Sequence, residues 1–145
     1  MPHDLLVHVT WTTYERMPLV TSGVATHLSA LLPLLAERGG GELVECAVLP
    51  THVHCVLELG PIIGLPRLVQ YLKGGSSRLV NQATPSARLR WAAGYDARTL
   101  GRRGLPPLRT YLDRQAEHHD MELLARWSRQ PALQGLPSPS AGFSP

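Results

Sequence analysis

The chain has 145 residues, a formal net charge of +3, 43% hydrophobic side chains and two cysteines. This length favours one domain, for which a single apolar core is sufficient. No apolar run reaches the roughly 18 residues of a membrane span, and the start lacks the basic region of a signal peptide, so we expect a cytoplasmic protein with reduced thiols.

The positive charge is concentrated in the middle of the chain. Residues 60–110 contain nine basic side chains and one acidic side chain, whereas the flanking segments are net negative. Nearly all the basic residues are arginine, which suits two-point contacts with phosphate. A GC-rich genome would explain arginine in place of lysine but not the clustering. The segment therefore indicates a polyanionic partner.

The first elements predicted along the chain are a strand and a helix. Apolar and polar residues alternate through residues 4–13, as in a half-buried strand. Thr21 or Ser22 can cap a helix whose apolar residues recur at helical spacing. Pro33 should kink this helix, and the three glycines at 39–41 should end it.

A hairpin is predicted next, with strands at 42–49 and 52–59 and a tight reversal between them. The core-facing residues of its first strand are expected to be Val44, Cys46 and Val48. The reversal would make Cys46 and Cys55 neighbours across the two strands, where we expect two reduced core thiols. Glu45 would then share a face with the histidines of the second strand, although a surface position is the simpler interpretation.

The apolar spacing then predicts a second helix from Leu65 to about Asn81. Gly74 and Gly75 weaken its middle by about 1 kcal/mol each, so close packing or the approach of DNA is the expected reason for them. Residues 82–88 are expected to form a loop, residues 89–100 short strands, and residues 101–104 a basic turn.

The last helix is expected to begin at Pro106 and to run to about Trp127. The order strand, helix, strand, strand, helix, strand, helix predicts an α+β fold, in which an antiparallel sheet carries helices on one or both faces. We expect one domain over residues 1–128 and a disordered tail, rich in proline, serine and glycine, over residues 129–145.

Four side chains form a candidate reaction centre. His52 and His54 lie two apart in a strand and share a face, whereas Tyr111 and Gln115 lie four apart in a helix and share a face. Two imidazoles and an amide oxygen can hold Mg²⁺ or Mn²⁺ when a phosphate supplies the missing charge. A tyrosine hydroxyl beside such a metal is a candidate nucleophile.

Five ordered segments over residues 5 to about 125 resemble the single-tyrosine HUH transposases of small insertion sequences, which include the repeat-associated tyrosine transposases. The segments are HVTWTTYERMPLV at 8–20, HVH at 52–54, LVQYLKGGSSRLVN at 68–81, WAAGY at 91–95 and YLDRQAEHH at 111–119. Two positions depart from the family pattern: Thr51 replaces a common Asp or Asn, and Ala92 replaces a common Gln.

The resemblance implies a ferredoxin-like sheet and a role for each of the four side chains. His52, His54 and Gln115 would be metal ligands, and Tyr111 would be the nucleophile that cuts and rejoins single-stranded DNA through a 5′-phosphotyrosine. It also implies hairpin-bearing DNA ends and a homodimer, in which the tyrosine helix of one subunit often meets the histidines of the other.

Further residues are expected to support this chemistry. His118 and His119 are candidates for the metal or its surroundings. Trp91 and Tyr95 could stack on bases, although aromatic residues beside a glycine usually serve packing. Tyr111 would be helped by the positive end of its helix dipole and by neighbouring arginines. Candidate contacts with the DNA backbone are Arg67, Lys73, Arg78, Arg102, Arg103 and Arg109.

Two other functions fit parts of the sequence. A domesticated protein could use the same fold to bind repeat hairpins without transposition, but the reaction centre is intact in sequence. A small nucleotide hydrolase would need a further histidine in the motif, at the position that Val56 occupies.

Overall fold

The computed structural model describes residues 5–62, 64–119 and 121–130, without the side chains of residues 118 and 119. The elements are β1 (Leu6–Thr12), a short 3₁₀ turn (Tyr14–Arg16), α1 (Ser22–Arg38), β2 (Gly41–Val48), β3 (His52–Leu59), α2 (Leu65–Ala83), β4 (Asp96–Leu100), a second 3₁₀ turn (Arg102–Gly104), α3 (Leu105–Asp113), α4 (Gln115–His119) and β5 (Ala125–Ser128). Most of the expected tail lies outside the described residues.

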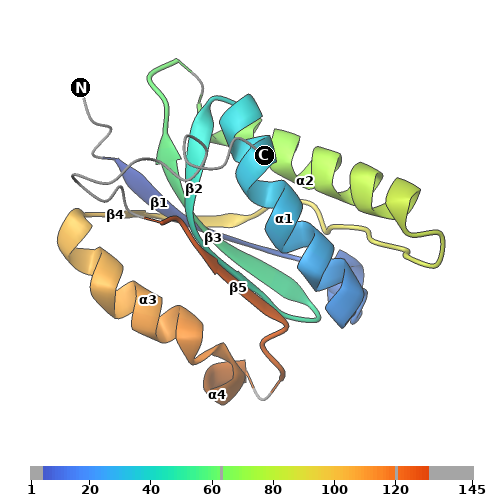
Figure 1. Ribbon diagram of the computed structural model, residues 1–145. Coiled ribbons are helices and arrows are strands. Elements are labelled where there is room, and N and C mark those ends of the chain that lie inside the picture. Colours follow the sequence, from blue (N-terminus) through green and yellow to red (C-terminus); the bar gives the residue numbers. More distant parts are fainter. Residues whose placement is uncertain (1–4, 63, 120, 131–145) are drawn as a thin grey trace, which may run out of the picture.

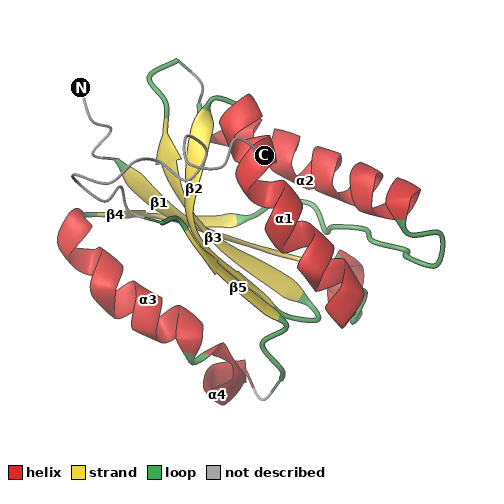
Figure 2. Ribbon diagram, in the orientation of Figure 1, coloured by secondary structure: helices red, strands yellow, loops and turns green. Residues whose placement is uncertain are grey.

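The strands form one antiparallel sheet in the order β4-β1-β3-β2-β5. Helices α1 and α2 lie on one face of this sheet and α3 lies on the other (Figures 1 and 2). The order β4-β1-β3-β2 is that of the expected ferredoxin-like sheet, and β5 extends the sheet beyond β2. The α+β prediction is therefore confirmed.

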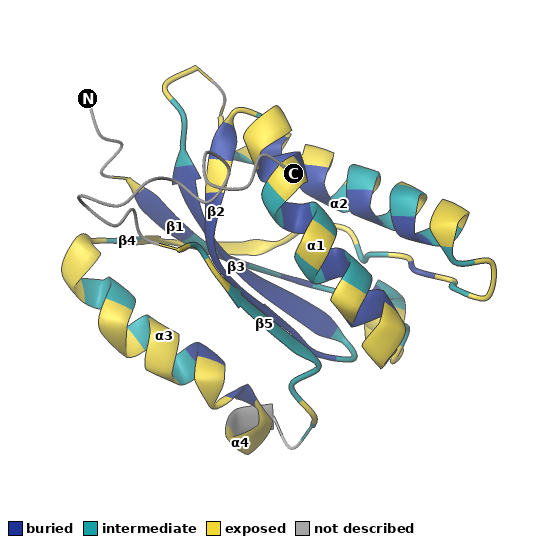
Figure 3. Cartoon of the chain, viewed as in Figure 1, coloured by how far each residue is buried: buried dark blue, intermediate teal, exposed yellow. Residues whose placement is uncertain are grey.

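The sheet separates two apolar clusters, because successive side chains of a strand point to opposite faces. The larger cluster lies beneath α1 and α2 and includes Val9, Trp11 and Leu28. The smaller cluster lies beneath α3 and consists of Leu6, Val44, Ala47, Val56 and Leu112. Figure 3 shows the buried strands between half-exposed helices. Each described helix is too short or too polar to cross a membrane.

Helix α1 begins where the sequence predicts. The Thr21 side chain accepts a hydrogen bond of 3.2 Å from the backbone nitrogen of Val24, which caps the first turn. Pro33 lies inside α1 and lacks a backbone donor, yet the helix remains continuous over 17 residues. The buried residues Leu32 and Leu35 on either side of Pro33 hold this part of the helix against the sheet.

The hairpin of β2 and β3 has the predicted reversal. The backbone nitrogen of Leu49 bonds to the carbonyl of His52 at 2.9 Å, and Cys46 lies opposite Cys55. Both thiols are buried and free, as expected. Burial, together with the neighbouring Cys46, raises the pKa of Cys55 well above its usual value, which keeps the thiol protonated.

One face assignment in β2 is wrong. The strand has a bulge, because Leu43 pairs with Leu57 whereas Glu45 pairs with the preceding residue, Val56. The extra residue, Val44, turns toward the smaller cluster, and Leu43 takes the expected place of Val44 in the larger core. A bulge of this kind reverses the alternation of every residue before it.

The predicted last helix is also wrong beyond Asp113. Helix α3 ends there, Arg114 has the non-helical angles φ −106° and ψ 25°, and the short α4 leads into β5, which pairs with β2. Trp127 packs on the larger cluster while Arg126 reaches Glu45 on the opposite face. This alternation is that of a strand. The pairing of β5 with β2 also satisfies the backbone hydrogen-bonding groups at the edge of β2, which a helix would have left unpaired.

Candidate active site

His52 and His54 lie side by side on β3, the central strand, on the sheet face that α3 covers. Their ring centroids are 5.0 Å apart, and each residue is only 4% exposed. The strand alternation that predicts this arrangement is therefore confirmed.

The Nδ1 atom of each ring has a polar neighbour. Thr51 Oγ1 lies 3.1 Å from Nδ1 of His52. Nδ1 of His54 lies 3.0 Å from Nε2 of His8 and 3.1 Å from Oγ1 of Thr10. With Nδ1 held in this way, the buried Nε2 atom is the one with which each ring could bind a metal.

The contacts of Thr51 favour the metal-binding tautomer of His52. The Thr51 hydroxyl has one hydrogen and can donate it to Sδ of Met121, which lies 3.6 Å away and can only accept. Its oxygen then accepts a hydrogen bond from Nδ1–H of His52. In that tautomer Nε2 of His52 carries the lone pair that a metal ligand requires.

Tyr111 lies against the histidine pair. Its ring meets His54 edge to face, with centroids 6.0 Å apart and an interplanar angle of 90°. Both rings border a cavity of about 400 Å³, here called the tyrosine cleft, which is lined by His8, Thr10, His54, Asp96, Arg98, Leu108 and Tyr111. The fold thus brings together a phenol and an imidazole pair that are far apart in sequence.

Gln115 follows Tyr111 across the break in the helix. The expectation that both residues share one continuous helix is wrong, because Arg114 separates α3 from α4. The Gln115 side chain is nevertheless fully buried, and its Nε2 donates to the carbonyl of Tyr111 at 3.0 Å. Its buried Oε1 has no hydrogen-bond donor within the described residues. An amide oxygen of this kind is a suitable ligand for Mg²⁺ or Mn²⁺.

The donor set is therefore two imidazoles and one amide oxygen. Among the described residues, no group of three or more His, Cys, Asp or Glu side chains could hold a metal ion. The neutral set fits a hard divalent cation when phosphate oxygens and water complete its coordination. The side chains of His118 and His119, which were candidates for the same site, lie outside the described part of the chain.

The expected help from the helix dipole is contradicted. Tyr111 lies in the last turn of α3, close to Asp113, so the negative end of the dipole is the nearer one. Three of the neighbouring arginines face glutamates instead: Arg102 with Glu58 at 3.8 Å, Arg109 with Glu45 at 2.6 Å and Arg114 with Glu117 at 3.9 Å. The cationic side chain that lines the tyrosine cleft is Arg98, which the sequence did not single out.

Glu45 is a buried anchor and not a surface residue. Its carboxylate is fully buried and bonds to Arg109 on α3 at 2.6 Å, and to Arg126 at 2.8 Å and Ser128 at 2.5 Å on β5. Burial raises the pKa of Glu45, but the hydrogen bonds from Ser128, Arg109 and Arg126 together lower it below its usual value. The charged form therefore ties the helix that carries Tyr111 to the sheet.

His8 and Thr10 on β1 are part of the site and were missed. The register places His8 opposite Arg98 on β4 and Thr10 opposite His54 on β3. Burial lowers the pKa of His8, while Asp96 raises it and Arg98 lowers it. The signal was present in the sequence, since both polar residues lie on the same face of the first predicted strand.

The six candidate DNA contacts do not form one surface. Arg67 and Arg78 are exposed on α2, on the face opposite Tyr111. Lys73 donates two hydrogen bonds of 2.7 Å to the carbonyls of Ala92 and Gly94. Arg102 and Arg103 lie in the 3₁₀ turn before α3, which carries Arg109.

Comparison with known proteins agrees with the fold and the site. The family model for IS200-like transposases matches residues 2–115. The ISDra2 transposase TnpA of Deinococcus radiodurans is 28% identical over 126 residues, which cover 83% of this chain and 88% of that protein.

Two solved structures share the fold. A crystal structure of a transposase from Deinococcus radiodurans R1 is 28% identical, with a TM-score of 0.62 over 76% of this chain and 89% of its own. A REP-associated tyrosine transposase bound to a REP hairpin is 14% identical and agrees in fold alone, with a TM-score of 0.59 over 82% of this chain and 70% of its own. With most of its length matched by the family model, this chain belongs to the IS200-like transposase family.

Proposed function

We propose that this transposase cuts and rejoins single-stranded DNA through a covalent 5′-phosphotyrosine at Tyr111. Membership of a transposase family makes it a DNA-cleaving enzyme. The observation that supports the finer statement is the contact between Tyr111 and His54 in a cleft that Arg98 also lines. A phenol, an imidazole pair and a guanidinium at one cavity suit the attack on a phosphodiester.

The reaction exchanges one phosphoester for another. The phenolic oxygen of Tyr111 bonds to phosphorus, the bond from phosphorus to the 3′ oxygen breaks, and the phenolic proton is lost as the departing 3′ oxygen gains one. A free phenol has a pKa of about 10, so its proton must leave during the reaction. The phosphotyrosine conserves the ester bond, so the 3′-hydroxyl of another strand can reverse the step without ATP.

The residues of the site have separate roles in this proposal. His52 and His54 through Nε2, with Gln115 through Oε1, would hold Mg²⁺ or Mn²⁺, which supplies Lewis-acid polarisation of the scissile phosphate. Arg98 would bind a phosphate oxygen at the open side of the tyrosine cleft, since its side chain is 79% exposed and its partner Asp96 lies 3.5 Å away.

The test is a covalent-adduct assay. Labelled single-stranded DNA from both flanks of the gene is incubated with the protein and Mn²⁺ or Mg²⁺, and the products are separated under denaturing conditions. We expect a protein–DNA band that disappears with Tyr111→Phe, with a chelator and with double-stranded DNA. Tyr71→Phe, a tyrosine exposed on α2, is the matched control and should keep the band.

The outcomes separate the proposal from its rivals. An adduct that persists in Tyr111→Phe would overturn the role of Tyr111. DNA binding without an adduct, for both flanks and both metals, would favour a repeat-binding protein without transposition. The hydrolase alternative is disfavoured, because Val56 is buried beneath α3 in the smaller apolar cluster.

We propose further that the DNA ends carry hairpins and that the protein works as a homodimer with one domain over residues 1–128. The proposal of hairpins is motivated by the REP-associated tyrosine transposase, a protein of the same fold that is bound to a REP hairpin. Light scattering of the purified protein checks the dimer, and a comparison of hairpin with unstructured DNA of equal length checks the hairpin.

A further inference from the structure

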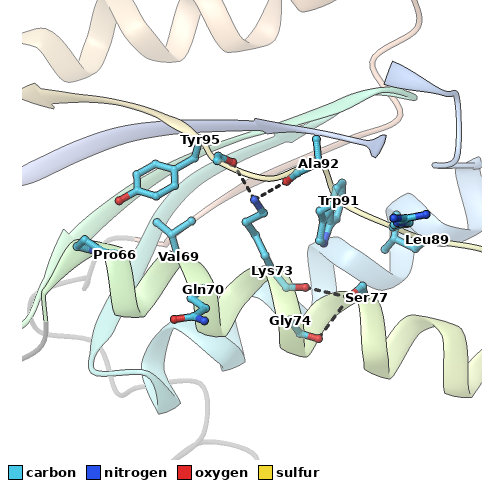
Figure 4. A pocket seen from close by; sticks show the side chains of 12 residues that line it. Pro66, Val69, Gln70, Lys73, Gly74, Ser77, Leu89, Trp91, Ala92 and Tyr95 are labelled. Carbon is cyan, nitrogen blue, oxygen red and sulfur yellow. Dashed lines mark hydrogen bonds between the residues drawn. The ribbon is translucent and has the colours of Figure 1, made fainter. Parts of the chain in front are cut away.

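We infer that a cavity between α2 and residues 89–95 binds one unstacked base of the single-stranded DNA substrate, on the face of the sheet opposite Tyr111. This cavity, called the α2 pocket, has a volume of about 540 Å³ and includes Val69, Gln70, Lys73, Gly74, Trp91 and Tyr95 in its lining. Figure 4 shows Lys73 between the rings of Tyr95 and Trp91. The inference rests on the proposed action on single-stranded DNA.

Hydrogen bonds hold the walls of the α2 pocket in place. Nε1 of Trp91 donates to Oγ of Ser76 at 3.1 Å, and the Trp91 ring meets Trp11 edge to face with centroids 5.8 Å apart. Lys73 joins α2 to the opposite wall through the two carbonyls that it bonds (Figure 4). Because the pocket is already formed, little conformational entropy of its side chains is lost when a ligand binds.

Gly74 keeps one wall of the pocket open. A Cβ atom built at Gly75 would lie 3.3 Å from Cδ2 of Leu35, so the packing of α1 on α2 explains that glycine. A Cβ atom at Gly74 would meet nothing within 4 Å, so packing does not explain why residue 74 is a glycine. Since a glycine inside a helix is unfavourable, its place in the pocket lining is the structural reason that remains.

The chemistry of the lining fits a nucleobase between two phosphates. Tyr95 is 38% exposed and presents an aromatic face for stacking, which is tolerant of base identity. Gln70 can donate to and accept from the edge of a base. The lining contains the cations Lys73 and Arg90 and no carboxylate, which suits a ligand that carries phosphate.

The α2 pocket and the tyrosine cleft are each lined by one of two consecutive residues of the chain. Tyr95 lines the pocket, and the next residue, Asp96, lines the cleft on the other face of the sheet. Both lie where β4, an edge strand of the sheet, begins. One extended DNA strand that crosses this edge can place a base in the pocket while a phosphate a few nucleotides away lies beside Tyr111.

The test compares two variants that change the pocket with one that does not. Gly74→Leu fills the pocket and Tyr95→Ala removes a stacking face. Tyr71→Ala, the control, removes an aromatic side chain on α2 that lies outside the pocket lining. Binding of fluorescent single-stranded flank DNA is measured by anisotropy, after thermal unfolding has shown that each variant is folded.

We expect Gly74→Leu and Tyr95→Ala to weaken binding by about 10-fold, the loss of one stacked base, and Tyr71→Ala to stay within about 2-fold. A scan with single abasic sites should find one nucleotide whose loss weakens the wild type but not Gly74→Leu. At saturating DNA the Tyr111 adduct should still form in Gly74→Leu, so loss of base binding is distinguishable from loss of the proposed reaction.

Two results would overturn the inference. In the first, Gly74→Leu and Tyr95→Ala bind DNA as the wild type does, and the abasic scan is the same for both proteins. In the second, Gly74→Leu changes the oligomeric state in light scattering without any change in DNA affinity, which would assign the α2 pocket to a second copy of the chain.

Discussion

Two residues of β1, His8 and Thr10, determine which nitrogen of His54 can bind a metal, because they can accept a hydrogen bond from Nδ1. Nε2 carries a lone pair only when Nδ1 carries the hydrogen and donates it to His8 or Thr10. Burial lowers the pKa of His8, although Asp96 raises it and Arg98 lowers it, so the neutral imidazole is favoured and its Nε2 can accept. His8 is thus a positioning residue for His54.

His8→Ala should weaken Mn²⁺ binding by about 10-fold, because the loss of a group that orients a ligand typically costs 10- to 100-fold in metal affinity. His8→Gln should lose less, since its amide oxygen can accept from Nδ1 of His54. The measurement is an Mn²⁺ titration followed by electron paramagnetic resonance, with ¹⁵N imidazole shifts of the metal-free protein as a readout of the tautomer.

His27→Ala is the matched control, because His27 lies on α1 across the sheet from the site. An unchanged Mn²⁺ affinity and an unchanged His54 tautomer in His8→Ala would remove the positioning role and leave Thr10 as the group that orients His54.

At the scale of the elements, Glu45 joins β2, α3 and β5. Its contacts reach Arg109 on α3, and Arg126 and Ser128 on β5, and Arg126 also bonds to Asp113 at 2.9 Å. The helix that presents Tyr111 is therefore fastened near its middle and at its C-terminal end. These polar contacts and the buried Leu112 together set the position of the nucleophile.

Glu45→Gln should lower the free energy of unfolding at pH 7 by about 2 kcal/mol, because it removes the charge between two arginines. The pKa of Glu45 is lowered in the folded state, so its contribution is present above the usual glutamate value and is lost as pH falls through the lower, folded value. Urea unfolding at pH 7 and near pH 3 should therefore show a smaller difference between wild type and variant in acid.

Asp113→Asn is the comparison variant for Glu45→Gln. Its side chain is 62% exposed, so loss of its bond to Arg126 should cost less than about 1 kcal/mol. A difference between wild type and Glu45→Gln that is the same at both pH values would show that the Glu45 charge contributes nothing to stability.

Local pattern was sufficient for the elements whose contacts are local. The alternation around His52 and His54, the Thr21 cap and the stripe from Leu65 gave β3, α1 and α2 nearly to the residue. The break of the helix at Arg114 and the strand β5 were not predicted, because Leu123 and Trp127 are spaced as on one helix face. Strand β5 forms through pairing with β2, which is distant in sequence.

The site divides in the same way. His52, His54, Tyr111 and Gln115 were predictable from motif and resemblance, and the structure places His54 in contact with both His52 and Tyr111. The second ring of residues required the register of the sheet. The sequence put His8 and Thr10 on one face of a strand, but only the pairing of β1 with β3 brings that face beside His54. Glu45 is buried through its contacts with Arg109 on α3 and with Arg126 and Ser128 on β5, which is distant in sequence.

For the whole molecule, the basic segment is divided between two faces of the sheet. Arg98 lines the tyrosine cleft on one face, whereas Arg67 and Arg78 are exposed on α2 on the other. The two α2 arginines are three helical turns apart, about 16 Å along one side of the helix. A substrate that meets all three has to reach both faces of the sheet, and the β4 edge, where Arg98 lies, is the edge beside the tyrosine cleft.

This arrangement predicts two separable kinds of arginine. Replacement of both Arg67 and Arg78 by Gln should reduce the slope of log K against log salt concentration by about 1.4, since each phosphate contact with single-stranded DNA contributes about 0.7. The same change should leave adduct formation on a short oligonucleotide intact, because those residues are remote from Tyr111. Arg98→Gln should instead slow adduct formation, with a smaller change in slope.

Arg16→Gln, which alters an exposed arginine outside the basic segment, should change neither quantity. If the double variant kept the wild-type slope, DNA would not reach α2, and the substrate would have to be confined to the face that carries Tyr111.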